Sequence, residues 1–333
     1  MAASVMVARH GKLVLHEGFG RLKHTKEAPR TEPDTVYLLA SISKPVTVCG
    51  LMLLVERGLV VLGDRVGRYL PDFQGAGKEK VLVRDLVAHT SGLPDMLPEN
   101  RELRVANAPL GEFVAGALRT PLLYEPRTDF AYQSMGTLLA GEIVERVSGS
   151  RLRDFLRREI FEPLGMRNSV LGLDGLKISE TAWVQEGEET DDTRNWGPNS
   201  PYWRDQGHPW GGMHSTTGDL ARLMQAFLNG GELNGTRLFA PTTTAAMIRD
   251  QNTTLAAPWG LGWGLRDSRV WNYFGDLGTQ GTFGHVGATG TVAWADPRRN
   301  LVCVLLTTRP SSYDRGALLN QVSNLAQAAV VEI

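Results

Sequence analysis

Ser41 and Lys44 are the first residues whose types and spacing could do chemistry. They stand three positions apart in the sequence S-I-S-K, directly before Pro45 and an apolar run. Proline is tolerated in the first turn of a helix, so Ser41 is expected at or next to a helix N-terminus. Residues three apart share one face of a helix, which places the lysine beside the serine.

Such a serine–lysine pair is typical of nucleophilic catalysis. A serine hydroxyl is a poor nucleophile until a neighbouring base takes its proton. A lysine can be that base if burial and the positive end of a helix lower the pKa of its amine. The alternative is a serine that caps a helix, followed by a surface lysine, because so short a motif also arises by chance.

Tyr132 is a candidate for proton transfer. It lies just before an apolar helical pattern that begins near Met135, and a tyrosine at such a junction can point into a cleft. Beside a lysine ammonium, its phenol would ionise more easily and could relay a proton. The alternative is a packed tyrosine whose hydroxyl is hydrogen-bonded at the surface.

His285 belongs to a glycine-rich stretch, G-H-V-G-A-T-G at residues 284–290. Glycines let a ligand approach a strand backbone closely, and such an edge can offer an amide N–H to a developing oxyanion. His285 would face the cleft as a polar or proton-carrying group. The alternative is a bend in a strand with a hydrogen-bonded histidine. Phosphate binding is not supported, because a strand rather than a helix follows the glycines.

The elements that must position these residues are strands at both ends of the chain and helices in the middle. Short apolar runs flank a turn signal at His10-Gly11, and the runs 291–295 and 301–306 flank a second turn. The apolar spacing predicts helices over 46–57, 81–89, 109–119, 135–147, 151–160, 219–228 and 313–330.

We therefore expect an α/β fold with an inserted all-α region, in which a mainly antiparallel sheet is built from both termini and flanked by helices. The sheet domain would comprise residues 1–60 and 220–333, and the helical domain residues 61–219. Residues 181–212 read as an irregular, substrate-facing loop. Within this loop, Tyr202 and Trp210 are expected to face the pocket, and the acidic run 186–192 is expected to be a solvated tip.

Composition excludes several classes of protein. The 333 residues carry 35 Lys and Arg against 36 Asp and Glu, a balance that argues against a nucleic-acid binder and against attachment to anionic lipid. Cys49 and Cys303 lie in apolar runs and are expected to be buried free thiols. His208 and His214 lack a third ligand at a recognisable spacing, so neither a metal nor another cofactor is expected. With no membrane-length apolar run and no signal pattern, we expect a cytoplasmic protein, or a periplasmic or secreted one if a signal was removed.

Taken in order, three motifs resemble the serine β-lactamase and penicillin-binding-protein superfamily. They are S-x-x-K from Ser41, Y-x-S from Tyr132 and H-x-G from His285. The match is closer to the class C branch and its esterase relatives, the family VIII carboxylesterases. Three further stretches look like the same family: residues 86–94, 211–220 and 259–263. The resemblance implies a fold of the β-lactamase/transpeptidase type.

The resemblance also implies roles for the motif residues. Ser41 would be the acylated nucleophile, and Lys44 and Tyr132 would activate it and protonate the leaving group. Backbone N–H groups of Ser41 and Ala288 would form the oxyanion hole. His285 would stand where related enzymes carry lysine or histidine.

Two predicted substrate contacts follow from the same motifs. Ser134 would occupy a position that is usually asparagine in β-lactamases and contacts the acyl amide, and Gly287 would line the substrate. His89 and Gly92 match a family signature and are interpreted as structural. Because Ser134 and His285 replace asparagine and lysine, the site would offer fewer contacts to a substrate amide and carboxylate, which favours short esters.

We therefore predict a serine hydrolase that forms an acyl-enzyme on Ser41, a carboxylesterase acting on short-chain acyl esters. Its partner would be a small-molecule ester or amide, with no nucleic acid and no membrane, and the oligomeric state is left open. One alternative is a D-amino-acid peptidase, a D-Ala carboxypeptidase or a weak β-lactamase. Another is a catalytically silent binding or scaffold protein on the same fold.

Overall fold

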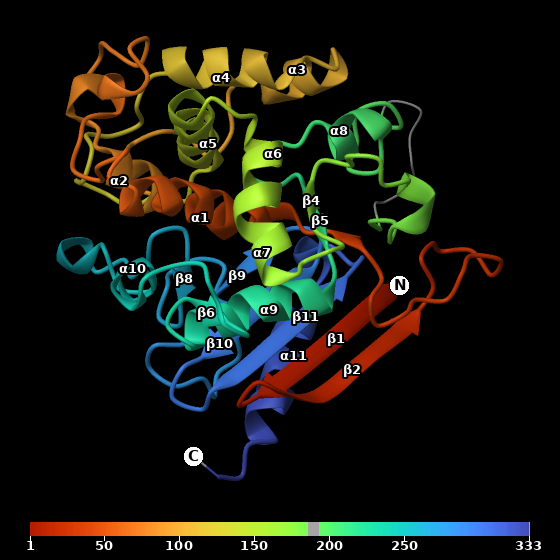
Figure 1. Cartoon of the computed structure of the whole chain (residues 1–333). Coiled ribbons are helices and arrows are strands. Elements are labelled where there is room, and N and C mark those ends of the chain that lie inside the picture. Colours follow the sequence, from red (N-terminus) through yellow and green to blue (C-terminus); the bar gives the residue numbers. More distant parts are fainter. Residues whose placement is uncertain (186–192, 333) are drawn as a thin grey trace.

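A six-stranded antiparallel sheet forms the base of the molecule in the computed structural model, which describes residues 1–185 and 193–332 (Figure 1). The strand order is β2-β1-β11-β10-β9-β8, so strands from both ends of the chain lie side by side, as the sequence predicts. The strands are β1 (Ala2–Arg9), β2 (Lys12–Gly20), β8 (Gly264–Leu265), β9 (Phe283–Gly287), β10 (Thr291–Asp296) and β11 (Leu301–Thr307).

Helices cover both faces of this sheet. Helix α9 (Thr217–Leu228) lies on one face and α11 (Ala317–Ala328) on the other (Figure 1). Alternation along β1 explains why both faces are apolar, because successive side chains of a strand point to opposite faces. Val5 and Val7 pack in the cluster with α11, while Ala8 belongs to the larger core on the α9 side.

Most of the remaining helices form a layer above the α9 face, whereas α10 (Pro241–Met247) lies at the level of α9 (Figure 1). Helix α1 is mostly apolar and buried on all sides, and it lies between α5 and the sheet (Figure 1). Each helix predicted from the sequence is present, with its ends shifted by a few residues. The helices are α1 (Ser43–Glu56), α2 (Val83–Val87), α3 (Asn100–Val105), α4 (Leu110–Arg119), α5 (Ser134–Ser148), α6 (Leu152–Leu156), α7 (Glu162–Leu164) and α10 (Pro241–Met247).

In its described residues, the segment 181–212, expected to be irregular, contains one short helix, α8 (Pro201–Asp205). The side chain of Ser200 accepts a hydrogen bond from the backbone N–H of Trp203, and Pro201 opens the first turn. The acidic run 186–192 lies outside the described residues. The division into a sheet domain and a helical domain at residues 60 and 220 remains a prediction.

A second, small sheet was not predicted, because its strands are too short to show a periodic pattern in the sequence. It contains β3 (Tyr37–Leu38), β5 (Met213–Ser215) and β4 (Val170–Leu171), in that order, and a separate hairpin pairs β6 (Glu232–Leu233) with β7 (Thr236–Arg237). Because β3 leads directly to Ser41, this sheet ties the start of α1 to a segment about 170 residues further along the chain.

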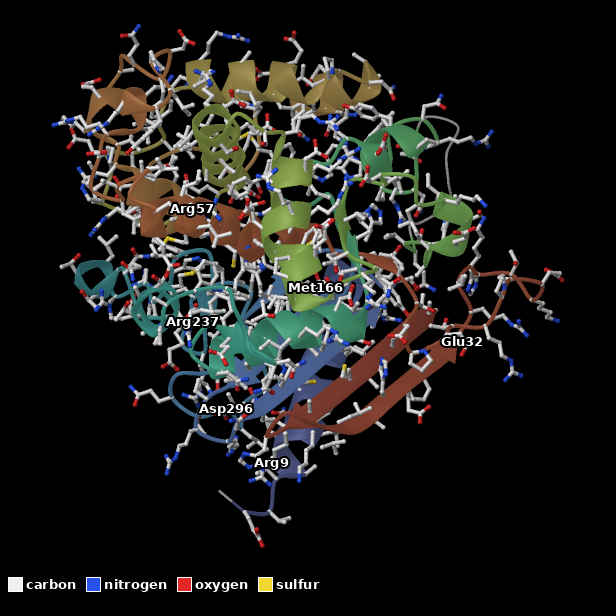
Figure 2. The ribbon with its side chains drawn as sticks, in the orientation of Figure 1. Arg9, Glu32, Arg57, Met166, Arg237 and Asp296 are labelled. Carbon is white, nitrogen blue, oxygen red and sulfur yellow. The ribbon has the colours of Figure 1, made fainter. Side chains whose placement is uncertain are left out.

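Figure 2 shows side chains filling the space between the layers, with Arg9 and Asp296 labelled at the hairpin ends of the main sheet and Arg57 at the end of α1. Cys49 and Cys303 are buried free thiols, as predicted. Within the described ranges, no helix combines the length and apolar character needed to cross a membrane. Over the same ranges, no group of three or more His, Cys, Asp or Glu side chains is placed to hold a metal ion.

Candidate active site

Ser41 lies in a single 3-10 turn, Ala40–Ile42, immediately before α1. Ala40 has a φ of 51°, a left-handed conformation that is strained for a residue with a side chain. The turn is held by Ser43, whose hydroxyl donates to the Ala40 carbonyl at 2.7 Å and accepts from the Met213 backbone N–H at 2.9 Å. The strained turn leaves Ser41 partly exposed at the start of a buried helix.

Lys44 lies one turn further along and is buried, with only 1% of its surface exposed. Its Nζ is 3.0 Å from Ser41 Oγ and donates to the carbonyl oxygen of Trp210 at 3.1 Å. Burial lowers the pKa of this amine from 10.5 to about 7, against an opposing contribution from the Asp95 carboxylate. Near neutral pH, a large fraction of the amine is therefore uncharged and can accept the serine proton.

Tyr132 joins Ser41 and Lys44 at the site. It lies two residues before the start of α5. Its ring lies 4.8 Å from Lys44 Nζ, and its hydroxyl is buried without a well-aligned hydrogen-bond partner in the described part of the chain. Burial raises the pKa of the phenol well above its usual value; the neighbouring Ser41 hydroxyl lowers this pKa and Asp95 raises it further. The expectation of easier ionisation beside lysine is therefore wrong, because desolvation outweighs it. The phenol therefore stays protonated and is able to donate a proton.

His285 lies inside β9, and its ring centroid is 6.0 Å from that of Tyr132. Its Nδ1 is 2.8 Å from the Val286 carbonyl oxygen, which assigns the ring proton to Nδ1 and leaves a lone pair on Nε2. Burial, with help from Lys44, lowers the pKa of His285 to about 3. The ring is neutral at physiological pH, so it brings an acceptor rather than a positive charge.

The turn between β9 and β10 is docked on the strand that leads to Ser41. The hydroxyl of Thr289 donates to the Leu38 carbonyl at 2.9 Å, and that of Thr291 donates to the Leu39 carbonyl at 2.8 Å. Ala288 is the exposed residue of this turn. The two threonines therefore bring the turn carrying Ala288 against the segment that carries Ser41, as an oxyanion site built from both would require.

Gly287 permits this close docking, because a Cβ at position 287 would overlap the carbonyl oxygen of Leu39 and the hydroxyl of Thr291. Its φ is not in the left-handed region, so the requirement is one of space rather than of backbone conformation. Gly287 therefore leaves room for β9 to lie against the segment that leads from β3 to Ser41. The substrate contact expected from the sequence stays a prediction.

Ser134 is buried at the first position of α5, where its hydroxyl donates to Asp95 Oδ1 at 2.6 Å. Its backbone N–H also donates to the Asp95 carbonyl, at 3.2 Å. Asp95 itself is exposed, and its charge acts on both Lys44 and Tyr132. Sequence reasoning missed this carboxylate, which stands one position beyond the stretch 86–94 that resembles the family.

Tyr202 and Trp210 are placed differently from the four residues at the centre of the site. The Tyr202 hydroxyl donates to the Ala108 carbonyl at 2.8 Å. The Trp210 indole is 3% exposed and packs against His208 and Phe113, so its carbonyl rather than its ring reaches Lys44. The structure thus brings together Ser41, Lys44, Tyr132 and His285. The rings of Tyr202 and Trp210 pack in the helical layer instead.

A mainly antiparallel sheet flanked by helices, with a serine–lysine pair at the start of a buried helix, defines the fold class of serine β-lactamases and penicillin-binding proteins. The model of the Beta-lactamase family matches residues 1–328, and the chain belongs to this family. As a member of the family, it belongs with the serine hydrolases.

Relatives of the chain carry more than one kind of name. A protein of Escherichia coli (strain K12), provisionally named a D-alanyl-D-alanine carboxypeptidase, is 29% identical over 93% of this chain and 79% of its own length. A penicillin-binding protein homolog from Caulobacter crescentus superposes with a TM-score of 0.81 at 25% identity, over 99% of this chain and 93% of that one. A family VIII carboxylesterase superposes with a TM-score of 0.77 at 22% identity, over 97% and 92% of the two chains.

Proposed function

We propose that this protein is a serine carboxylesterase that forms an acyl-enzyme on Ser41 and acts on short-chain acyl esters. The observation that carries the proposal is the 3.0 Å separation of Lys44 Nζ and Ser41 Oγ, together with a lysine pKa of about 7. A base with a pKa near the working pH is the most effective at removing a proton that is being transferred. The same pair would have no such use in a silent scaffold.

The proposed reaction begins with transfer of the Ser41 proton to neutral Lys44 while the serine oxygen attacks the ester carbonyl. Backbone N–H groups of Ser41 and Ala288 stabilise the oxyanion. The phenol of Tyr132 then protonates the leaving alkoxide and recovers its proton from the Lys44 ammonium. Attack of water on the acyl-enzyme uses the same groups in the reverse sense.

Two features favour an ester over a substrate that carries an amide and a carboxylate. The only proton of the Ser134 hydroxyl is already donated to Asp95, so this side chain has none to give to a substrate carbonyl. His285 is neutral, so it offers no charge to a substrate carboxylate, which proteins usually bind with cationic side chains. Both features reduce the recognition of a peptide C-terminus.

The second candidate is a D-alanyl-D-alanine carboxypeptidase. It is favoured by the 29% identity to a relative provisionally given that name, which extends over most of both chains. The two candidates share the acyl-enzyme on Ser41 and differ in the leaving group. They are therefore separated by substrate rather than by the catalytic residues.

The test compares p-nitrophenyl butyrate with a peptide ending in D-Ala-D-Ala, using wild-type protein and Ser41→Ala. A fluorophosphonate probe followed by peptide mapping locates the reactive serine independently. Ser148→Ala is the matched control, because Ser148 ends α5 about 21 Å along the helix from its first residue. Ester hydrolysis that falls at least ~10³-fold in Ser41→Ala alone supports the esterase. D-Ala release without esterase activity supports the second candidate. Absence of both activities and of labelling overturns both.

A further inference from the structure

His89, interpreted from the sequence as structural, is bonded to the chain on both sides of Tyr132. Its carbonyl accepts the backbone N–H of Ala131 at 3.1 Å, and its Nδ1 accepts the backbone N–H of Gln133 at 3.3 Å. The centroid of its ring is 4.7 Å from that of the Tyr132 phenol, and its side chain is buried. One residue thus holds the main chain before and after the tyrosine and packs against its ring.

The hydrogen bonds also fix the chemical form of the His89 ring. Because Nδ1 accepts from Gln133, the proton of the neutral ring is on Nε2. Burial lowers the pKa of His89 well below its usual value, and Lys44 and His285 lower it further, so the ring stays neutral. Besides His89, the titratable groups that act on Tyr132 by charge or ring contact are Lys44, Asp95 and His285, and His285 is also neutral.

Polar atoms without well-aligned partners gather around the same tyrosine. The Tyr132 hydroxyl, His89 Nε2, His285 Nε2 and Trp259 Nε1 are all buried, and none makes a well-aligned hydrogen bond in the described part of the chain, although the Ser41 hydroxyl lies near that of Tyr132. Ring contacts connect all four residues, from 4.7 Å between His89 and Tyr132 to 6.0 Å between Tyr132 and His285. Buried polar atoms are nearly always paired unless the site has a functional use for them.

The backbone of His89 carries a further sign of constraint. Its φ is 61°, in the left-handed region that few residues other than glycine adopt. In this conformation, both its carbonyl and its ring bond to the segment that carries Tyr132.

We propose that His89 is a positioning residue for Tyr132, which keeps the phenol at the serine–lysine pair during acylation. This inference rests on the proposed acyl-enzyme function and extends it to a residue outside the motifs that carry the chemistry. His89 contacts neither substrate nor the attacking oxygen in this proposal. It acts through the tyrosine, so its effect must disappear when the tyrosine hydroxyl is removed.

The test compares His89→Gly with His89→Asn. Both residues tolerate a positive φ, but only asparagine can place an acceptor near the position of Nδ1. The value of kcat/KM for an alkyl ester such as ethyl butyrate reports acylation, and its alkoxide leaving group needs the proton of Tyr132. This value should fall about 10²-fold in His89→Gly, as expected for a misplaced catalytic group. It should stay within about tenfold of the wild type in His89→Asn, and the apparent dissociation constant of the substrate should not change in either variant.

The same substitution is then made in Tyr132→Phe. We expect His89→Gly to cost less than about threefold in that background, because the hydroxyl that it positions is gone. Phe130→Ala is the packing control: its ring lies 6.0 Å from that of His89 in the same cluster, but it shares no hydrogen bond with the histidine. This control should slow acylation less than about threefold.

The outcomes separate the inference from the function on which it rests. A wild type that neither hydrolyses the ester nor reacts with a fluorophosphonate contradicts the proposed function. An active wild type whose His89→Gly loss persists undiminished in Tyr132→Phe, or is matched by His89→Asn, overturns the positioning role. If His89→Gly does not fold, as judged by its thermal unfolding, His89→Gln replaces it, since glutamine cannot place its oxygen at the Nδ1 position.

Discussion

The amine of Lys44 lies 3.0 Å from the hydroxyl oxygen of Ser41, although the lysine is removed from water. The carbonyl of Trp210 takes one N–H of the amine and leaves its lone pair free for the serine proton. A lysine in this position is useful as a base because it is desolvated. The same burial sets the pH range of the reaction and lowers the stability of the protein.

Hydrolysis of p-nitrophenyl butyrate should increase with pH and level off above an apparent pKa of about 7. The sign follows from the base role, because only the uncharged Lys44 can accept the serine proton, and burial gives this amine a pKa of about 7. The measurement is kcat/KM between about pH 5 and pH 9, which reports groups of the free enzyme. A profile that is flat or falls across neutrality would exclude Lys44 as the base.

Asp95→Asn should lower the apparent pKa of this pH profile, so that hydrolysis begins to increase at lower pH. The carboxylate of Asp95 stabilises the Lys44 ammonium and so raises its pKa; its removal lets burial act with less opposition. Asparagine can still accept the hydrogen bond from Ser134. Asp129→Asn is the control, because Asp129 is also exposed but acts on the pKa of Tyr124 rather than on that of Lys44. Equal shifts in both variants would point to a general charge effect.

Lys44→Met should be inactive and more stable than the wild type. The pKa of the lysine is about 7 when folded and 10.5 when unfolded, so the unfolded state binds more protons between these values. The lysine is therefore most destabilising below pH 7, and the penalty shrinks by roughly 1.4 kcal/mol per pH unit from there to about pH 10. Chemical denaturation at pH 6 and pH 9 is the measurement (about three pH units apart). An equal gain at both pH values would contradict the assigned pKa.

Tyr132→Phe should slow acylation by about 10² to 10⁴ without loss of stability. The missing hydroxyl is a proton donor to the leaving group in our proposal, whereas in the folded protein it is buried near the Ser41 hydroxyl without a well-aligned hydrogen bond. Removing such an atom does not destabilise a protein as removing a bonded one would. The value of kcat/KM for an alkyl ester such as ethyl butyrate, whose alkoxide must be protonated, and thermal unfolding check the two halves separately. An unchanged kcat/KM for this ester would remove Tyr132 from the mechanism.

Gly287→Ala should lower both kcat/KM and the melting temperature. A Cβ at this position would overlap the Leu39 carbonyl, so the turn carrying Ala288 must move away from the strand that leads to Ser41. We expect a destabilisation of about 1–3 kcal/mol, as is usual for overpacking. Gly111→Ala is the control, since its added Cβ meets nothing within 4 Å and alanine favours the helix α4. A fully active Gly287→Ala would show that the docked turn is not needed.

The sequence was sufficient for features that depend on local patterns. The two hairpins of the sheet, the helices and the placement of Ser41 just before α1 follow from turn residues, apolar spacing and a proline in the first turn. The functional roles of Ser41, Lys44, Tyr132 and His285 stay predictions, although the structure brings the four side chains together.

Features that depend on burial and on contacts between distant segments could not be predicted. The neutral state of His285 and the high pKa of the Tyr132 phenol result from desolvation, which no local pattern reveals. Lys44 donates to the backbone carbonyl of Trp210, which any residue at position 210 would offer. The amino-acid type at that position therefore cannot predict the contact. The bonds between His89 and the chain around Tyr132 join two loops more than 40 residues apart.

The place of β1 in the sheet constrains how the protein can be made. Strand β1 pairs with β2 on one side and β11 on the other, and the Ala2 N–H bonds to the Thr308 hydroxyl, 306 positions away. On the ribosome, the β1–β2 hairpin emerges long before β11 and has an unpaired edge until β11 is synthesised. Such edges are prone to pair with other chains. Closure of the sheet therefore waits for β11, and the nascent chain is most exposed to aggregation before that strand emerges.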